Sequence, residues 1–286
     1  MIRVIIQAGF GNQLFQYATA YALAQELGQP LEVDTSFFCW YNKNHPATAR
    51  ESAMELLKLD AHTTRTSCNS RIWIYQPWFI LPFRYFPFYV GGLPMVVEDI
   101  ANCRQDQRYL FRKIGKRGAT IFGFWQNTVY FDKYILDLKR QFQPNYELHE
   151  SVSLLHLKVT SCESVGVHIR RGDFVGLGWD KGVDYYLKGM AWVKEKKPEV
   201  RFFIVTDDKQ WAREQFSNRD DITIIDINTS TCDIDEFFLL SSCKHQIISE
   251  STFGWWAAYL NTNIEKMVLV PETAKGQIFR DEWIRI

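Results

Sequence analysis

The stretch Val165–Phe174, VGVHIRRGDF, constrains the fold of this chain more than any other. Apolar residues alternate with others over its first five positions, which predicts a short strand, and Arg170 and Arg171 follow directly. In α/β proteins, ligands bind at the carboxyl ends of parallel strands. Because a guanidinium offers several N–H donors to phosphate oxygens, the two arginines can hold a diphosphate without a metal ion. The alternative is a local salt bridge to Asp173, with His168 a satisfied core histidine.

The composition limits the class of protein. The chain has 286 residues and is 47% hydrophobic, enough for one large domain or two small ones. Lysine plus arginine equals aspartate plus glutamate at 33 each, which argues against a nucleic-acid binder or a polybasic membrane tether. No CxxC pair indicates zinc, no signal peptide is evident, and no apolar run reaches the ~18 residues of a membrane span. We therefore expect a soluble cytoplasmic protein, with peripheral membrane contact left open.

The chain opens with a strand, a glycine-bearing turn and a helix, which we expect at residues 2–7, 8–13 and 14–27. Glycine lets a backbone approach a ligand, and a helix start offers unpaired N–H groups. The pattern resembles a dinucleotide site, but its third glycine is missing, so NAD is not favoured. Asn12 and Gln13 in the turn offer amide groups that can both donate and accept hydrogen bonds.

The middle of the chain is less informative. Residues 72–97 combine many aromatics with four prolines, which forbid a continuous helix. An irregular buried connection is the simplest interpretation; an aromatic wall for a sugar and a membrane-touching patch are the alternatives. A strand is expected over 120–125, followed by Gln126, and a domain boundary near 145–160.

Further strand ends in the second half also carry polar groups. The buried strand 200–206 ends in Asp207 and Asp208, of which either can bind a guanine base or cap the next helix. A strand at 246–249 leads to Ser251 and Thr252 at a helix start, where phosphate binds well and where serine also serves as a simple cap. Since parallel strands place their carboxyl ends at one edge, the combination favours a nucleotide-diphosphate site.

Asp233 and Asp235 form an Asp-x-Asp pair that can hold Mn²⁺ or Mg²⁺ beside a nucleotide diphosphate. Glu236 lies three residues after Asp233, which is the spacing of a capping box at a helix start. We favour the capping box and predict no metal site.

The sequence resembles the α-1,2-fucosyltransferases of glycosyltransferase family 11, and more distantly the α-1,6- and protein O-fucosyltransferases. The resemblance covers nearly the whole chain and rests on GFGNQLFQYATAYAL, GFWQN, HIRRGDFVGLGW, TDD and SSCKHQIISESTFGWWAAYL. The chain departs from the usual family pattern at Glu250, where Asn is common, and at Gly254, where Ser is common. Its opening AGFG replaces the common GGLG.

The resemblance implies an α/β protein of GT-B type with two facing Rossmann-like domains, at residues 1–150 and 151–286, and GDP-fucose bound mainly by the second. The implied reaction moves fucose from its β linkage on GDP to an α-1,2 linkage on a terminal galactose, with inversion and with no metal or other cofactor. Lactose, another β-galactoside or a lipid-linked O-antigen repeat is the expected acceptor.

The resemblance also suggests roles for residues. Arg170 and Arg171 would stabilise the leaving diphosphate, Asp173 would act as general base or orient the acceptor, and Asn12 would orient the acceptor or the glycosidic oxygen. The donor-binding candidates are Gly11, His168, Arg170, Arg171, Asp207, Asp208, Ser251, Thr252 and Phe253. The acceptor-side candidates are Gln13, Trp125, Gln126, Trp179 and Asp184.

Three alternatives stay open from the sequence. The protein could be a fucosyltransferase of different linkage, α-1,6 or protein O-linked. It could bind a GDP-sugar without turnover. An Asp233–Asp235 metal site would instead make it a metal-dependent glycosyltransferase of the other common fold.

Overall fold

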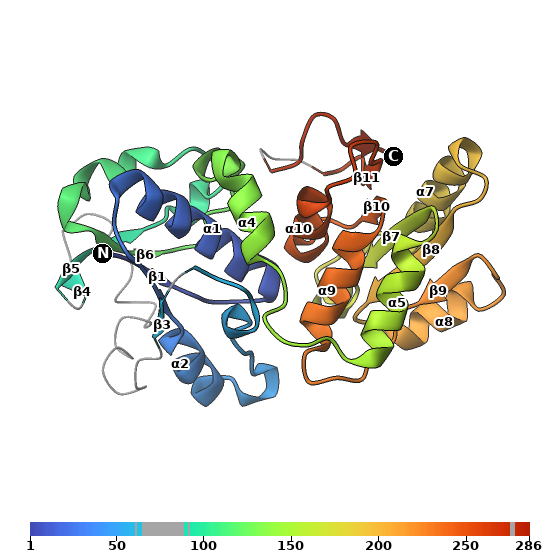
Figure 1. Ribbon diagram of the computed structural model, residues 1–286, viewed down its shortest axis with the longest axis horizontal. Coiled ribbons are helices and arrows are strands. Elements are labelled where there is room, and N and C mark those ends of the chain that lie inside the picture. The colour runs from blue at the N-terminus through green and yellow to red at the C-terminus, as the bar shows by residue number, and fades with distance from the viewer. Residues whose placement is uncertain (61, 65–88, 91, 275–277) are drawn as a thin grey trace. The chain divides into compact units, whose positions relative to one another are not determined.

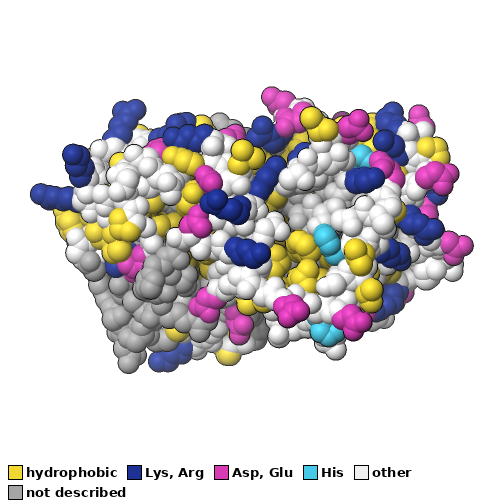
Figure 2. Space-filling view, in the orientation of Figure 1, with side chains coloured by type: hydrophobic (Ala, Val, Ile, Leu, Met, Phe, Trp, Pro, Cys, Tyr) yellow, Lys and Arg dark blue, Asp and Glu magenta, His cyan; other side chains and the backbone are white. Residues whose placement is uncertain are grey.

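The computed structural model describes the chain except residues 61, 65–88, 91 and 275–277 (Figure 1). The chain divides into two compact units, Met1–Asn145 and Tyr146–Ile286, which we call the N-terminal and C-terminal units. Our sequence-based boundary was 150/151. No helix in the described part of the chain is long and apolar enough to cross a membrane. Figure 2 shows basic and acidic side chains mixed over the visible face, in keeping with the zero net charge.

The N-terminal unit contains a six-stranded sheet in the order β3-β2-β1-β6-β5-β4, parallel except for the pairing of β4 with β5. Its strands are β1 (Ile2–Ile5), β2 (Leu31–Asp34), β3 (His62–Thr64), β4 (Tyr89–Val90), β5 (Leu93–Val97) and β6 (Ala119–Phe122). Its α-helices include α1 (Phe10–Leu27), α2 (Ser36–Asn44) and α4 (Ile135–Gln141). The buried helix α1 begins four residues earlier than predicted, so Asn12 and Gln13 lie in its first turn and not in a loop.

The C-terminal unit contains a second six-stranded sheet, entirely parallel, in the order β12-β11-β10-β7-β8-β9. Its strands are β7 (Ser164–Ile169), β8 (Arg201–Thr206), β9 (Ile222–Ile224), β10 (His245–Ile248), β11 (Val268–Val270) and β12 (Ile284–Arg285). Its helices are α5 (Glu150–Thr160), α6 (Gly172–Gly176), α7 (Gly182–Lys196), α8 (Lys209–Phe216), α9 (Cys232–Ser242) and α10 (Thr252–Leu260). The chain runs outward from β7 in one direction, then returns to β10 on its other side, which is the strand order of a Rossmann fold.

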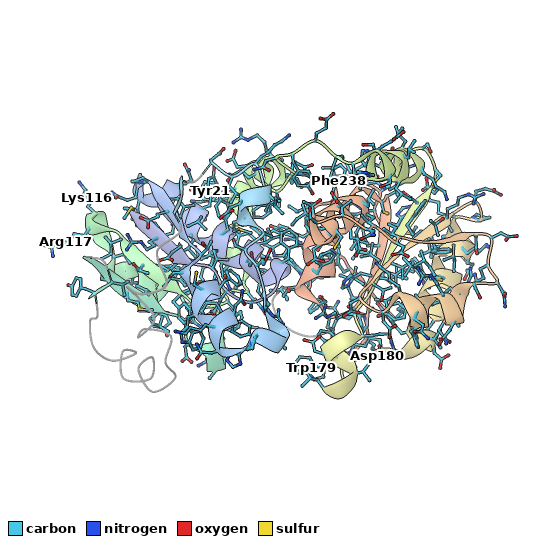
Figure 3. All side chains as sticks on the ribbon, turned by 90° about the horizontal axis from the view of Figure 1, so that it is seen from below. Tyr21, Lys116, Arg117, Trp179, Asp180 and Phe238 are labelled. Carbon is cyan, nitrogen blue, oxygen red and sulfur yellow. The ribbon has the colours of Figure 1, made fainter. Side chains whose placement is uncertain are left out.

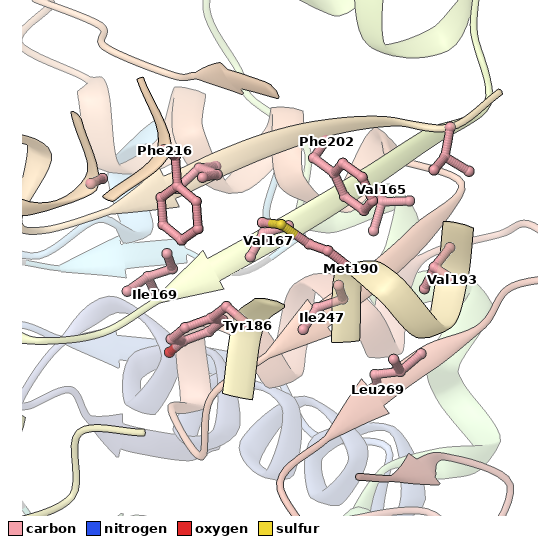
Figure 4. Close-up of a cluster of buried hydrophobic side chains, with 13 residues drawn as sticks. Val165, Val167, Ile169, Tyr186, Met190, Val193, Phe202, Phe216, Ile247 and Leu269 are labelled. Atoms are coloured by element: carbon pink, nitrogen blue, oxygen red, sulfur yellow. The ribbon is translucent and has the colours of Figure 1, made fainter. Parts of the chain in front are cut away.

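The central strand β7 has two different faces because its side chains alternate. Val165, Val167 and Ile169 join a buried cluster with side chains of α7, α8 and the neighbouring strands, as Figure 4 shows. On the opposite face, a Cβ at Gly166 would lie 2.7 Å from Leu240 Cδ1, so that the absence of a side chain lets α9 pack closely. This face therefore also brings His168 against the helices that follow β9 and β10.

Several predicted boundaries were wrong. The sequence pattern predicts a glycine-bearing loop over residues 174–179 and a helix over 184–196 with Asp184 as its cap. The structure instead has helix α6 in part of that loop, and α7 begins at Gly182, so Asp184 is an exposed first-turn residue and not the cap. Leu93–Val97 forms β5, although we expected residues 72–97 to be irregular; positions 72–88 and 91 lie outside the described residues. Strands β11 and β12 were not predicted.

Candidate active site

The carboxyl ends of β7, β8 and β10 meet at one edge of the C-terminal sheet. Ile169 of β7 pairs with Thr206 of β8, and His168 pairs with Ile248 of β10. The residues directly after each strand are therefore close in space although far apart in sequence. The edge lies where the strand order reverses between β7 and β10, and such a switch point is where open α/β sheets bind ligands.

Arg170 follows β7 and points its guanidinium at two carboxylates. Its Nε and Nη2 donate to Asp173 Oδ1 at 3.0 and 2.8 Å, and its Nη1 lies 3.0 Å from Asp207 Oδ2. The side chain is 33% exposed. The predicted local salt bridge to Asp173 is thus present, and about a third of the Arg170 side chain is exposed to solvent.

Arg171 is more enclosed, with 17% of its side chain exposed. Its Nη1 donates to Asp180 Oδ2 at 2.7 Å and its Nε to Asp208 Oδ2 at 3.1 Å. Its guanidinium lies over the ring of Trp211 at 4.2 Å, a cation–π contact. These three contacts hold the Arg171 guanidinium in one orientation. The two adjacent arginines therefore have different surroundings.

Asp207 and Asp208 both have protein partners. Asp208 caps α8 by accepting from the Trp211 N–H at 3.0 Å, which confirms the capping alternative for one of the two. That hydrogen bond, together with Arg171, holds the pKa of Asp208 below its usual value. Asp207 accepts from the Arg171 N–H at 2.9 Å. A Cβ at Gly172 would lie 2.7 Å from Asp207 Oδ2, so glycine permits this close turn.

His168 is buried at the β7 edge. Burial, with the nearby Arg170 and Lys209 charges, lowers its pKa to about 3, so the imidazole is neutral at physiological pH. Its Nδ1 lies 3.3 Å from Ser249 Oγ, and its ring stacks on Phe253 with centroids 5.1 Å apart. A Cβ at Gly254 would lie 2.8 Å from Nδ1, so glycine at this position leaves room for the imidazole ring.

The first turn of α10 carries the predicted hydroxyl residues. Ser251 is its N-cap and its Oγ accepts from the Phe253 N–H at 3.3 Å, the simple cap that we kept as an alternative. Thr252 begins the helix. Both side chains are partly exposed beside His168 and the end of β10. The first turn of α10 therefore lies at the same edge of the sheet as the two arginines.

The Asp-x-Asp pair of α9 is not built as a metal site. Asp235 is buried and accepts hydrogen bonds from Tyr146, Thr229 and Thr231 hydroxyls at 2.7–2.8 Å. Asp233 is exposed. No group of three metal-ligating side chains occurs among the described residues. The predicted capping box was also wrong, since α9 begins at Cys232 and Thr231 is its N-cap position.

The N-terminal unit has its own polar group at the strand ends. Asn12 Oδ1 accepts from Gln126 Nε2 at 2.8 Å, which joins the start of α1 to the segment after β6. Gln13 is buried, and its amide binds the backbone of Ala8, Glu51 and Ala53. It therefore holds the fold together rather than presenting an amide at the surface.

Trp125, an acceptor-side candidate, is fully buried and packs on Phe111 and Tyr130. Its backbone has the left-handed φ of 54°, which is uncommon for a large residue. Buried Glu98 accepts its N–H at 2.9 Å and holds this turn. Burial raises the pKa of Glu98 to about 7, against the opposing effect of these backbone hydrogen bonds.

The sequence did not reveal Asp180 and Trp211, which hold Arg171, or Glu98, which holds the Trp125 turn in the N-terminal unit. Asp180 stands seven residues after Asp173, beyond the glycine-bearing loop, so that only the folding of α6 brings it back to Arg171. A tryptophan in an amphipathic helix is ordinarily interpreted as core. The charge pattern RRGD followed by a second aspartate was the one signal that could have indicated Asp180.

Comparison with solved structures defines the class of fold. The chain aligns with an α-1,6-fucosyltransferase NodZ soaked with GDP-fucose over 91% of this chain and 92% of that one, with a TM-score of 0.52 and 19% identity. It aligns with Arabidopsis thaliana FUT1 in complex with GDP over 95% of this chain and 70% of that one, with a TM-score of 0.54 and 13% identity. The protein has the GT-B type of glycosyltransferase fold, with two Rossmann-like domains, as predicted.

Residues 106–286 match the model of glycosyl transferase family 11, and the chain belongs to that family, which confirms the resemblance. It is 29% identical to the Escherichia coli O-antigen biosynthesis glycosyltransferase WbnK over 98% of this chain and 99% of that protein. It is also 29% identical to an Escherichia coli α-1,2-colitosyltransferase, over 98% of this chain and 97% of that protein. A rabbit (Oryctolagus cuniculus) galactoside α-(1,2)-fucosyltransferase 2 is 25% identical over 94% of this chain and 69% of its own length.

The buried neutral His168 predicts a pH dependence of stability. Its pKa is lowered in the folded protein, so unfolding takes up a proton between the folded value of about 3 and the ordinary value of 6.5. The free energy of unfolding should therefore fall below pH 6.5. Between pH 7.5 and 5.0, we expect the free energy of unfolding, measured with urea, to fall by about 2 kcal/mol more in the wild type than in His168→Gln. Equal losses in the two proteins would show that the imidazole accepts a proton without unfolding.

Proposed function

We propose that this protein transfers L-fucose from GDP-β-L-fucose to the 2-OH of a terminal galactose, with inversion at the anomeric carbon and without a metal ion. The observation that carries the proposal is Arg170, a partly exposed guanidinium at the switch point of the C-terminal sheet. The family, and relatives named for α-1,2 transfer, support the type of linkage. The acceptor is a galactose-terminated oligosaccharide or lipid-linked glycan, and we expect the reaction to be cytoplasmic.

In the proposed reaction, the acceptor oxygen forms a bond to C1 of fucose while the bond from C1 to the β-phosphate oxygen breaks. GDP leaves with the electron pair, and the acceptor hydroxyl gives up its proton to the Asp173 carboxylate, our candidate general base, or to solvent water. Negative charge therefore grows on the β-phosphate as positive charge grows on the sugar. Arg170 is our candidate to stabilise that phosphate, and preorganised electrostatic stabilisation of this kind is usually the largest single contribution to catalysis. Arg171 is held by Asp180, Asp208 and Trp211, and its role is to keep the strand end in shape.

The proposed donor site is rich in carboxylates. Asp173, Asp180, Asp207 and Asp208 surround the two arginines, so the local net charge is negative. A diphosphate must therefore displace a carboxylate before it can pair with Arg170. Asp173 is the one to move, because its side chain is half exposed and α6, which carries it, is only five residues long. Asp207 is more enclosed and is also held by the Arg171 N–H.

A second donor is worth testing because one relative that matches nearly the whole chain is named an α-1,2-colitosyltransferase. Colitose is fucose without its 3-hydroxyl group, so GDP-colitose would place the same diphosphate against Arg170. Discrimination between the two sugars would depend on a hydrogen bond to that hydroxyl, whose loss in a site built for it is costly.

The purified protein, given GDP-fucose and lactose in the presence of EDTA, is expected to form an α-1,2-linked fucosyl-lactose, read by mass spectrometry and NMR. A parallel reaction with GDP-colitose tests the second donor. An α-1,6 linkage, or binding of GDP without transfer to any galactoside, would replace the proposal by one of the alternatives. Activity that EDTA abolishes and Mn²⁺ restores would refute the account in which arginine alone stabilises the leaving group.

Arg170→Ala should lower the transfer rate by about two to four orders of magnitude, because it removes ~3–5 kcal/mol of transition-state stabilisation. The measurement is kcat and kcat/KM at saturating acceptor. Arg213→Ala is the control, since Arg213 is an exposed, ion-paired arginine of the neighbouring helix α8. Retention of most activity in Arg170→Ala would remove Arg170 from the mechanism.

Asp173→Asn should bind GDP more tightly than the wild type, because the carboxylate that competes for Arg170 is gone. Partly exposed ion pairs contribute ~0.2–1 kcal/mol, which corresponds to about a 1.5- to 5-fold lower Kd by calorimetry. Asp226→Asn is the control, because Asp226 is an equally exposed aspartate paired with an arginine. Weaker GDP binding by Asp173→Asn would show that Asp173 supports the donor site instead of blocking it.

A further inference from the structure

Three large apolar side chains are exposed within five residues of one another beside the arginines. Val175, Leu177 and Trp179 have exposures of 51%, 54% and 55%. They belong to the segment Gly172–Lys181, which contains helix α6 and which we call the α6 segment. Figure 3 shows Trp179 and Asp180 next to α6 at the lower margin of the C-terminal unit. Apolar groups exposed together at the edge of a polar site are characteristic of a binding surface.

The α6 segment is fixed at both ends to the strand ends of the sheet. At its start, Asp173 binds Arg170; at its end, Asp180 binds Arg171. Lys181 Nζ then donates to Glu250 Oε2 at 2.8 Å, beyond the end of β10, and to Thr273 Oγ1 at 3.1 Å. The Asp180 and Lys181 contacts remain when a diphosphate displaces Asp173, so the exposed apolar row stays held next to the proposed donor site.

The ring of Trp179 is supported within the same segment. It meets the ring of Phe174 in a T-shaped contact with centroids 5.5 Å apart, and the Trp179 N–H donates to the Phe174 carbonyl oxygen at 2.8 Å. Phe174 in turn lies under the Arg170 guanidinium at 5.9 Å. The indole is thus presented to solvent in a defined orientation rather than on a freely moving loop.

We propose that the α6 segment is the acceptor-binding surface, with Trp179 packing against the apolar C–H face of a pyranose ring of the acceptor. This inference rests on the proposed function, since it takes the acceptor to be a galactoside. Aromatic side chains combine large apolar area with low conformational cost, and a sugar ring offers one apolar face and a rim of hydroxyls. Asp173, released from Arg170 by the diphosphate, then lies at the edge of the surface as an acceptor for a sugar hydroxyl.

A sugar fits this surface better than a membrane does. Interfacial segments pair their apolar face with lysine or arginine, which binds anionic lipids. In the α6 segment the charged residues are Asp173, Asp180 and Lys181, and the lysine is already paired with Glu250. A half-exposed aspartate next to the apolar row would repel an anionic bilayer but can receive hydrogen bonds from hydroxyls.

The test compares Trp179→Ala and Trp179→Phe with the wild type in steady-state transfer to lactose. We expect the KM for lactose to rise about 10- to 50-fold in Trp179→Ala and less in Trp179→Phe, which retains an aromatic face. The KM for GDP-fucose and the Kd for GDP should change less than about twofold. Leu154→Ala is the matched control, because Leu154 is similarly exposed on α5.

Saturation-transfer NMR of lactose on the protein with GDP gives a reading that needs no turnover. If the wild type transfers no fucose but lactose signals depend on Trp179, the proposed function fails and the surface assignment stands. If the wild type transfers fucose and Trp179→Ala has an unchanged lactose KM, or changes the donor KM instead, the surface assignment fails alone. Loss of binding to phosphatidylglycerol vesicles with unchanged lactose KM would identify the row as a membrane contact and overturn the inference.

Discussion

The ion pairs between two adjacent arginines and four carboxylates organise the candidate site of this glycosyltransferase. A parallel sheet brings the ends of β7 and β8 together, and the charges that follow these strands are then forced into contact. Each arginine is fixed before a ligand arrives, and fixed charge is what electrostatic catalysis requires. The same pairs attach the α6 segment to the sheet edge, so that one network holds both the strand ends and the surface beside them.

Glycine at three positions lets the strands and helices around the site pack closely. Gly166 lets α9 approach the central strand, Gly172 lets the chain turn past Asp207, and Gly254 leaves room for the imidazole of His168. None of these three glycines takes part in the chemistry. At each of them, however, a side-chain atom of another residue lies within 3 Å of where a Cβ would be. The polar groups of the site thus depend on close packing between strands and helices as much as on their own hydrogen bonds.

Sequence patterns predicted the class of fold and most of the strands that lead into the site. Buried strands such as β8 have uninterrupted apolar runs, and polar residues directly after them identify a binding edge. The patterns failed where tertiary contacts determine the local structure or the burial of a side chain. Helix α6 forms because Asp173 and Asp180 are both drawn to the arginines, and Trp125 is buried because Glu98, distant in sequence, fixes its turn. Capping was misjudged at Asp184 and Asp233, where a helix began earlier than its first acidic residue.

The arginines are chemically identical, and only their surroundings separate their functions. Arg171, with three partners and half the exposure of Arg170, would have to give up two ion pairs and its contact with Trp211 to turn toward a ligand. Arg170 is ion-paired with two carboxylates, one of them on a short exposed helix, and a diphosphate would offer it the same chemistry with greater charge. Under the proposed function, the diphosphate therefore replaces one partly exposed ion pair of Arg170 by another, and release of GDP restores the first.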